Sequence, residues 1–124
     1  MKRKSVLIVE DELSLSEALK IKISKAGYEV LIAQDGAEGL RVALEKKPAL
    51  ILLDIVMPKM DGISMLKELR KDAWGKDVRV VLLTNLDDTG KITDAFEQDA
   101  LNYLVKSDWK LDDIIKKIDN WISD

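Results

Sequence analysis

The chain has 124 residues, enough for one globular domain and too few for two of ordinary size. A hydrophobic content of 47% and a charged content of 35% are typical of a soluble folded protein, and the net charge of −3 argues against direct binding to nucleic acid. The sequence contains no cysteine and no histidine, which excludes disulfides, thiolate and imidazole chemistry and a phosphohistidine, and leaves carboxylates, hydroxyls and amines for any reaction.

Five short apolar segments rich in Val, Ile and Leu alternate along the chain with five segments of helical periodicity. The expected strands cover residues 6–9, 28–33, 49–53, 78–83 and 102–105. The expected helices carry apolar residues three or four positions apart within residues 15–23, 37–44, 63–69, 92–96 and 111–122. Because the more continuous strands lack the alternation of a sheet with one wet face, we expect a five-stranded parallel sheet covered on both sides. The pattern predicts a three-layer, doubly wound α/β sandwich, with residues 1–124 forming a single domain without a second one.

Helix boundaries are marked by capping residues. Asp35 and Glu38 form a plausible capping pair at the start of the second helix, and residues 46–48, Lys-Lys-Pro, are expected to end it. Gly27 is expected to end the first helix in the same way. These signals support the limits drawn from periodicity.

Polar residues directly follow four of the predicted strands, where the sites of open α/β sheets lie. These residues are Glu10, Asp11 and Glu12 after the first strand, Asp54 after the third, Thr84 after the fourth and Lys106 after the fifth. If the first and third strands are neighbours, three carboxylates share one small volume. Two unit charges about 4 Å apart repel by roughly 4 kcal/mol at an effective dielectric constant near 20, so the site should hold a positive partner.

A hard divalent cation would relieve this repulsion, and Mg²⁺ is commonly held by one or two carboxylates plus a phosphate oxygen. Lys106 would add a second positive charge. A carboxylate, a metal ion, a lysine and a hydroxyl around one point suit phosphoryl transfer, in which Asp54 attacks as the nucleophile. The predicted product is an aspartyl phosphate.

Four motifs in the same order resemble the receiver domains of two-component response regulators, in particular the single-domain chemotaxis type. The motifs are "VLIVEDE" at 6–12, "LILLDIVMPKMDG" at 50–62, "VVLLTN" at 80–85 and "ALNYLVKS" at 100–107. The resemblance covers essentially the whole chain. It implies a flavodoxin-like fold with the strand order 2-1-3-4-5.

The resemblance also implies a metal site around the phosphoacceptor. Asp54 would accept the phosphoryl group, and Asp11 and Asp54 would bind Mg²⁺ directly. Glu10 would assist through water, and the Val56 main-chain carbonyl would be the other protein ligand.

The resemblance implies roles for three further residues, of which Thr84 and Tyr103 would form the switch. Lys106 would pair with the phosphoryl oxygens, and the Thr84 hydroxyl would move to bond the phosphate. That movement would draw Tyr103 inward and remodel the face made by the fourth helix, the fifth strand and the fifth helix.

The chain departs from the family pattern beside two of these residues. Ser107 follows Lys106, where the family usually has a proline that forms a cis peptide bond. A cis bond before another residue costs about 2.5–4 kcal/mol, so the loop either carries this cost or runs trans with the lysine placed differently. Asn85, which follows Thr84, is larger than the family's usual residue and is expected to narrow access to Asp54.

Val56 and Leu86 lie two positions beyond Asp54 and Thr84, at the positions that tune phosphate lifetime in the family. Both side chains are apolar and cannot orient an attacking water. We therefore expect slow self-dephosphorylation.

The predicted function is that of a signalling domain that catalyses only its own phosphorylation and slow dephosphorylation. The donor would be a histidine kinase or a phosphotransfer protein. After phosphorylation, the face made by the fourth helix, the fifth strand and the fifth helix would bind a downstream protein or a second copy of the chain. No apolar run approaches the roughly 20 residues of a membrane span, and no signal peptide is recognisable, so we expect a cytoplasmic protein without nucleic-acid or membrane partners.

Two alternatives stay open. A receiver-like adaptor would keep the fold without becoming phosphorylated, which the residues Ser107 and Asn85 favour. A magnesium phosphohydrolase of the haloacid-dehalogenase type would also use a strand-end aspartate. That family carries a second aspartate two positions later, where this chain has Val56.

Overall fold

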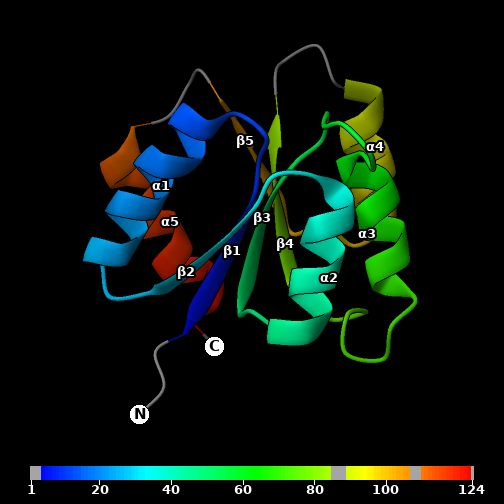
Figure 1. Ribbon diagram of the computed structural model, residues 1–124, viewed down its shortest axis with the longest axis horizontal. Helices are drawn as coiled ribbons and strands as arrows, with labels where there is room; N and C mark the ends of the chain where they lie inside the picture. The colour runs from blue at the N-terminus through cyan, green and yellow to red at the C-terminus, as the bar shows by residue number, and fades with distance from the viewer. Residues whose placement is uncertain (1–3, 85–88, 107–109, 124) are drawn as a thin grey trace.

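The computed structural model describes residues 4–84, 89–106 and 110–123, in which strands and helices alternate. The strands are β1 (Ser5–Val9), β2 (Glu29–Ala33), β3 (Leu50–Asp54), β4 (Arg79–Thr84) and β5 (Asn102–Val105). The helices are α1 (Leu13–Lys25), α2 (Gly36–Lys46), α3 (Gly62–Arg70), α4 (Thr89–Glu97) and α5 (Leu111–Ile122). The predicted alternation is confirmed (Figure 1).

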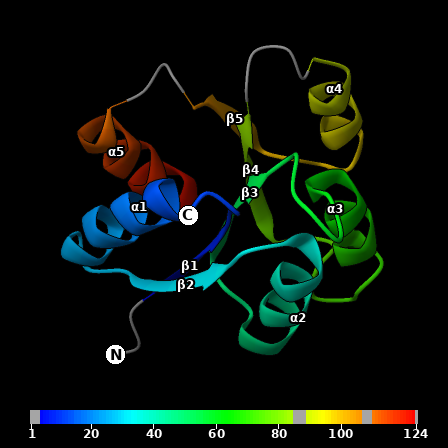
Figure 2. The same cartoon turned by 45° about the horizontal axis from the view of Figure 1, so that its top comes forward.

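The strands form one parallel sheet in the order β2-β1-β3-β4-β5. Helices α1 and α5 cover one face of the sheet, and α2, α3 and α4 cover the other (Figures 1 and 2). Parallel neighbours need crossover connections, which α1, α2, α3 and α4 supply, and α5 follows the last strand and packs beside α1, so the sheet is enclosed on both faces. The three-layer, doubly wound architecture and the strand order implied by the family resemblance are both confirmed.

Side chains of the central strands point alternately into two apolar clusters. In β1, Leu7 and Val9 pack with α2, α3 and α4, whereas Val6 and Ile8 pack with α1 and α5. All four side chains are completely buried, and each fully buried Leu, Ile or Val contributes about 1.5–3 kcal/mol. This two-sided packing fixes the central strands, and with them the residues at their carboxyl ends.

The predicted helix boundaries agree with the structure. The Asp35 carboxylate accepts a hydrogen bond of 2.8 Å from the Glu38 amide and caps α2, which ends at Lys47 in a left-handed conformation with φ of 50°. Gly27 follows the end of α1 with φ of 102°, a value that glycine adopts without strain. Glu12 occupies the position before α1, but its side chain makes no capping hydrogen bond.

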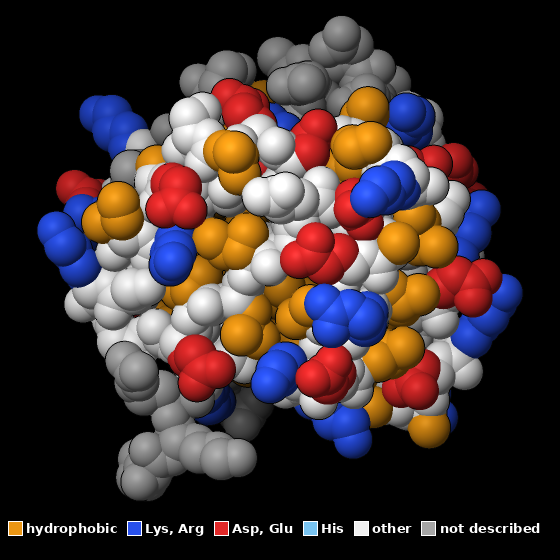
Figure 3. Space-filling view, in the orientation of Figure 1, with side chains coloured by type: hydrophobic (Ala, Val, Ile, Leu, Met, Phe, Trp, Pro, Cys, Tyr) orange, Lys and Arg blue, Asp and Glu red, His pale blue; other side chains and the backbone are white. Residues whose placement is uncertain are grey.

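Helix α5 packs a single apolar stripe on the sheet. Ile114, Ile118 and Ile122 are buried, and Ile115 and Trp121 are partly buried beside them. Among the described residues, no helix combines the length and the apolar character that a membrane span requires. On the face seen in Figure 3, acidic and basic side chains are interspersed among hydrophobic ones.

Candidate functional site

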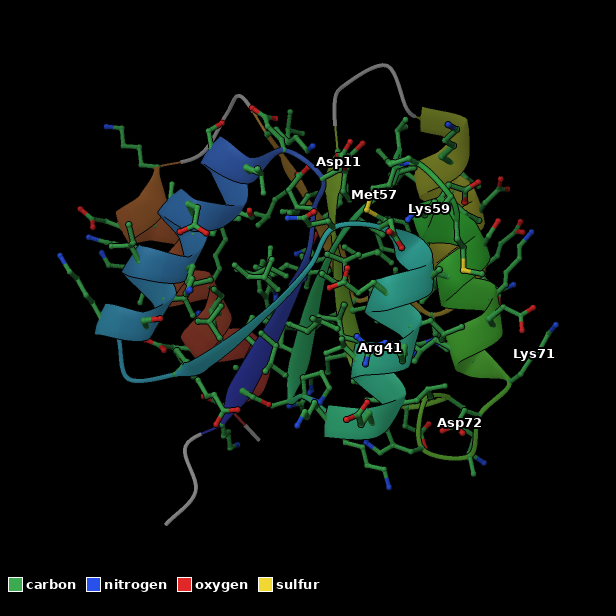
Figure 4. The ribbon with its side chains drawn as sticks, in the orientation of Figure 1. Asp11, Arg41, Met57, Lys59, Lys71 and Asp72 are labelled. Carbon is green, nitrogen blue, oxygen red and sulfur yellow. The ribbon has the colours of Figure 1, made fainter. Side chains whose placement is uncertain are left out.

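The sheet brings the predicted site residues to one edge. In the register of β1 with β3, Val9 lies opposite Leu53, so the next residues, Glu10 and Asp54, are neighbours. The Lys106 amide donates to the Thr84 carbonyl over 2.8 Å, which places the end of β5 beside the end of β4. Figure 4 shows the same edge at the top of the view, where Asp11 and Met57 are labelled.

Three carboxylates gather at this edge, as the sequence predicted. Glu10, Asp11 and Asp54 each contribute one carboxylate oxygen to a group whose members lie within 4.8 Å of one another. Glu10 is completely buried and Asp54 is 4% exposed, whereas Asp11 is exposed to solvent. Oxygen donors of this kind, with one side open to water, fit the preference of Mg²⁺ for carboxylates and retained waters.

Lys106 contacts two of these carboxylates. Its Nζ atom lies 2.7 Å from Glu10 Oε1 and 3.2 Å from Asp54 Oδ2. The other oxygen of Glu10, Oε2, accepts a hydrogen bond of 3.0 Å from the Glu12 amide. Glu10 therefore holds the lysine and is itself held at the end of β1.

Burial and neighbouring charge set the protonation of the site. Burial first, and then the Glu10 carboxylate, raise the pKa of Asp54 from 3.8 to about 7, although Lys106 opposes the rise. Burial favours the neutral amine of Lys106, but its contacts with Glu10 and Asp54 outweigh this effect and raise its pKa. Lys106 is therefore charged, and Asp54 exchanges its proton near neutral pH.

The two predicted switch residues lie in different environments. Thr84 ends β4 and is 1% exposed, next to the carboxylate cluster. Tyr103 in β5 is 42% exposed, and its ring meets the Phe96 ring edge to face, with centroids 6.2 Å apart. In this conformation the tyrosine is on the surface and is not drawn into the site.

The loop between β3 and α3 carries Val56, the predicted carbonyl ligand, whose side chain is exposed. The Gly62 amide donates to the Ile55 carbonyl over 2.8 Å, and the Gly36 amide donates to the Met60 carbonyl over 2.9 Å. These hydrogen bonds join the two ends of the loop and tie the loop to the start of α2.

A second contact between this loop and α2 involves residues that sequence reasoning did not assign to the site. Lys59 Nζ lies 3.8 Å from Asp35 Oδ2. Lys59 has φ of 67°, and the amide after it donates to the Pro58 carbonyl over 2.8 Å, forming a tight three-residue turn. The Pro-Lys pair in "MPKMDG" signals a turn, but its contact with the capping residue Asp35 has no local sequence signal.

Several predictions concern residues outside the described ranges. They are the effect of Asn85 on access, the role of Leu86 in phosphate lifetime, and the geometry of the Lys106–Ser107 peptide bond. The remaining site residues are brought together as described above: Glu10, Asp11, Asp54, Thr84 and Lys106.

The fold and the site together define a class of protein: a doubly wound α/β domain with a cluster of carboxylates and a lysine at the carboxyl ends of its strands. Residues 6–119 match the family model of the response regulator receiver domain. The chain belongs to the response regulator receiver domain family.

Curated relatives of the chain are transcriptional regulators. The probable transcriptional regulator ycf27 of Cyanophora paradoxa is 38% identical over 104 residues, which cover 84% of this chain and 42% of that protein. The regulatory protein PhoP of Bacillus subtilis is 36% identical over 103 residues, covering 83% and 42%. The chain thus spans less than half the length of these relatives.

Solved structures confirm the receiver fold. Chemotaxis protein CheY4 of Vibrio cholerae superposes with a TM-score of 0.87 at 28% identity, over 96% of this chain and 98% of that chain. The receiver domain of sensor histidine kinase PA1611 from Pseudomonas aeruginosa gives a TM-score of 0.87 at 26% identity, over 98% of both chains. The PA1611 structure contains a magnesium ion coordinated in its active-site cleft.

Proposed function

We propose that Asp54 accepts a phosphoryl group from a histidine kinase or a phosphotransfer protein, with Mg²⁺ held by Asp11, Asp54 and the Val56 carbonyl. The observation that carries this proposal is the nearly buried Asp54 carboxylate, with the Lys106 ammonium 3.2 Å away and two more carboxylates beside it. This grouping supports phosphoryl transfer because it pairs a nucleophile with positive charge at the strand ends of a receiver fold.

In the proposed reaction, one oxygen of Asp54 attacks the phosphorus atom as the bond from phosphorus to the donor's imidazole nitrogen breaks. The electron pair of that bond stays on the nitrogen of the donor, and the product is an aspartyl phosphate on this chain. A bound Mg²⁺ would neutralise part of the charge on the phosphoryl oxygens.

The chain's own residues would then rearrange around the new group. Lys106 now contacts Glu10 and Asp54 and would transfer one contact to a phosphoryl oxygen. The buried Thr84 hydroxyl would donate to another phosphoryl oxygen. Movement of Thr84 would make room for Tyr103, which now lies on the surface against Phe96.

The output that we propose is a change in the face made by α4, β5 and α5, which would bind a downstream protein or a second copy of the chain. The curated relatives include the DNA-binding regulator RpaA of Synechocystis, but DNA binding is stated of that protein, of which the chain covers 42%. For the present chain we propose output through protein contact. Its cytoplasmic location stays a prediction.

Intact-mass spectrometry tests the proposal. Incubation with Mg²⁺ and acetyl phosphate is expected to add one phosphoryl group to the wild-type protein, and none to Asp54→Asn or to wild type in excess EDTA. After removal of the donor, the phosphoryl group is expected to persist because Val56 offers no polar group to orient water.

Lack of uptake by the wild type would favour the unphosphorylated adaptor. Steady turnover of a phosphate ester would favour the phosphohydrolase, and loss of the group within seconds would contradict slow self-dephosphorylation.

Magnesium affinity is expected to depend on pH through Asp54. Since burial and Glu10 raise the pKa of Asp54 to about 7, the carboxylate binds a proton below this pH, and Mg²⁺ must displace that proton. Affinity should therefore fall up to about tenfold for each pH unit below about 7 and level off above it. Calorimetric titration with MgCl₂ across this range measures the effect. The Asp54→Asn variant is the control, and a wild-type curve as flat as that of the variant would contradict the prediction.

A further inference from the structure

Arg70 is the last residue of α3, and its guanidinium group joins two segments that lie beyond that helix. Nη1 donates to the carbonyls of Gly75 and Val78 over 2.7 and 2.8 Å, in the connection between α3 and β4. Nε donates to the Gln98 carbonyl over 2.8 Å, and Nη2 donates to the Asp99 carbonyl over 3.0 Å. Gln98 and Asp99 directly follow the last residue of α4.

All four of these acceptors are main-chain carbonyls, so the arginine acts on the backbone of its neighbours. Carbonyls at the end of a helix lack partners within the helix, and a cation there also interacts favourably with the helix dipole. A guanidinium presents its N–H groups in a rigid planar fork, whereas a lysine ammonium offers donors from a single atom. One arginine can therefore hold both segments, which a lysine could not do with the same geometry.

The exit from α4 is also fixed by its own backbone. The Ala100 amide donates back to the Ala95 carbonyl over 3.1 Å, and Asp99 takes a left-handed conformation with φ of 61°. The Leu101 amide then donates to the Val80 carbonyl in β4 over 2.8 Å. Together with Arg70, these bonds anchor the carboxyl end of α4 to α3 and to the sheet.

Toward the amino end of α4 the described side chains are mostly exposed. Among the described side chains of residues 90–94, Ile92 is partly buried and the others are exposed. A methyl group added at Gly90 would meet no atom within 4 Å. The anchored and the less constrained ends of α4 therefore differ in how easily they can move.

The two ends of α4 also differ in their distance from the phosphoacceptor edge. Lys71 and Asp72, which follow Arg70, lie at the opposite end of the molecule from Asp11 and Met57 (Figure 4). The amino end of α4 lies toward the edge that carries the site, and its carboxyl end points away from it (Figure 1). A displacement that starts at the phosphoacceptor edge therefore reaches the amino end of α4 before its carboxyl end.

We infer that Arg70 is a positioning residue that makes the carboxyl end of α4 the pivot of the switch, so that phosphorylation swings the amino end of the helix. This inference rests on the proposed function, because it describes how the change at Asp54 reaches the α4 surface. Arg70 itself does not touch the reacting atoms.

Hydrogen–deuterium exchange with peptide-level mass spectrometry tests the inference on the whole chain. In wild type treated with Mg²⁺ and acetyl phosphate, exchange should change in the first turns of α4 and stay constant at residues 98–101. In Arg70→Met, exchange at residues 98–101 should be about tenfold faster without phosphate, and the phosphate-induced change should extend over the whole helix. Arg70→Lys should give an intermediate result and provides a second variant if Arg70→Met does not fold.

Arg41→Met is the matched control because Arg41 is exposed on α2 and pairs within that helix with Glu45. It should leave the exchange at residues 98–101 unchanged. Intact mass measured on each sample shows first whether Asp54 is phosphorylated, which separates failure of the proposed function from failure of the pivot. Wild-type exchange at residues 98–101 that changes on phosphorylation as much as the first turns of α4 would overturn the inference. Unaltered exchange there in unphosphorylated Arg70→Met and Arg70→Lys would also overturn it.

Discussion

Replacing Lys106 with methionine is expected to lower the free energy of unfolding by about 3 kcal/mol near pH 8 in the absence of divalent cations. The reason is that Lys106 lies between a completely buried Glu10 and an Asp54 that is 4% exposed. Without the ammonium, two carboxylates would face each other with no positive partner in place of the lysine. Urea denaturation followed by tryptophan fluorescence measures the difference.

The loss of stability in Lys106→Met could come from the missing charge or from the changed packing. Its dependence on pH and on Mg²⁺ distinguishes these two causes. The pKa of Asp54 is raised from 3.8 in the unfolded chain to about 7, so the folded state binds the extra proton as the pH falls through 7. The destabilisation of Lys106→Met should therefore shrink toward pH 5, roughly two units below that pKa. Added Mg²⁺ should also restore much of the stability and should bind more tightly than to wild type, since the competing cation is gone.

The control for this prediction is Lys71→Met. Lys71 is exposed and pairs with Glu68 one turn earlier in the chain. Exposed pairs of this kind contribute about 0–1 kcal/mol, so the control should unfold close to wild type. If Lys106→Met lost no more stability than Lys71→Met, or lost equally at all pH values, the charge argument would be wrong.

Replacing Gly62 with alanine is expected to cost about 2–3 kcal/mol and to weaken Mg²⁺ binding. A Cβ atom at this position would lie 2.2 Å from the Asp54 carbonyl oxygen and 3.0 Å from Ile55 Cα. Both obstacles are backbone atoms of Asp54 and Ile55, which cannot move without shifting the loop that carries Val56. Denaturation and Mg²⁺ titration of the same samples would show both effects.

Gly90→Ala provides a matched helical glycine, because nothing lies within 4 Å of its added methyl group. Alanine there should be neutral or stabilise the protein by up to about 1 kcal/mol through helix propensity. A Gly62→Ala variant that behaved like Gly90→Ala in both measurements would show that the loop accommodates the methyl group without disturbing the site.

The sequence by itself determined the alternation of strands and helices and the residues at the strand ends. Apolar runs covered on both sides predict buried parallel strands, and polar residues at their carboxyl ends predict a site. Asp54 and Lys106 could be named in this way because each directly follows an apolar run. Capping by Asp35 and the left-handed turn at Gly27 were also predictable, since both depend on residues within one turn.

The strand order was not contained in the periodicity and was taken from the family resemblance, because side-chain alternation reports how a strand is buried and not which strand is beside it. Tertiary structure also decided that Lys106 approaches Glu10 more closely than Asp54. Sequence reasoning had given Glu10 only an indirect role through water. The protonation of Asp54 near neutral pH follows from this burial and this packing.

Two further contacts could be found only in the folded chain. Lys59 approaches Asp35, and Arg70 reaches the carbonyls of Gln98 and Asp99 across 28 and 29 residues of sequence. Local patterns carry information over a turn of helix or a few residues of strand, whereas these contacts depend on how α2, α3 and α4 pack side by side. The sequence therefore determined which polar groups follow the strands, and the packing of the helices decided how the β3–α3 loop and the carboxyl end of α4 are held.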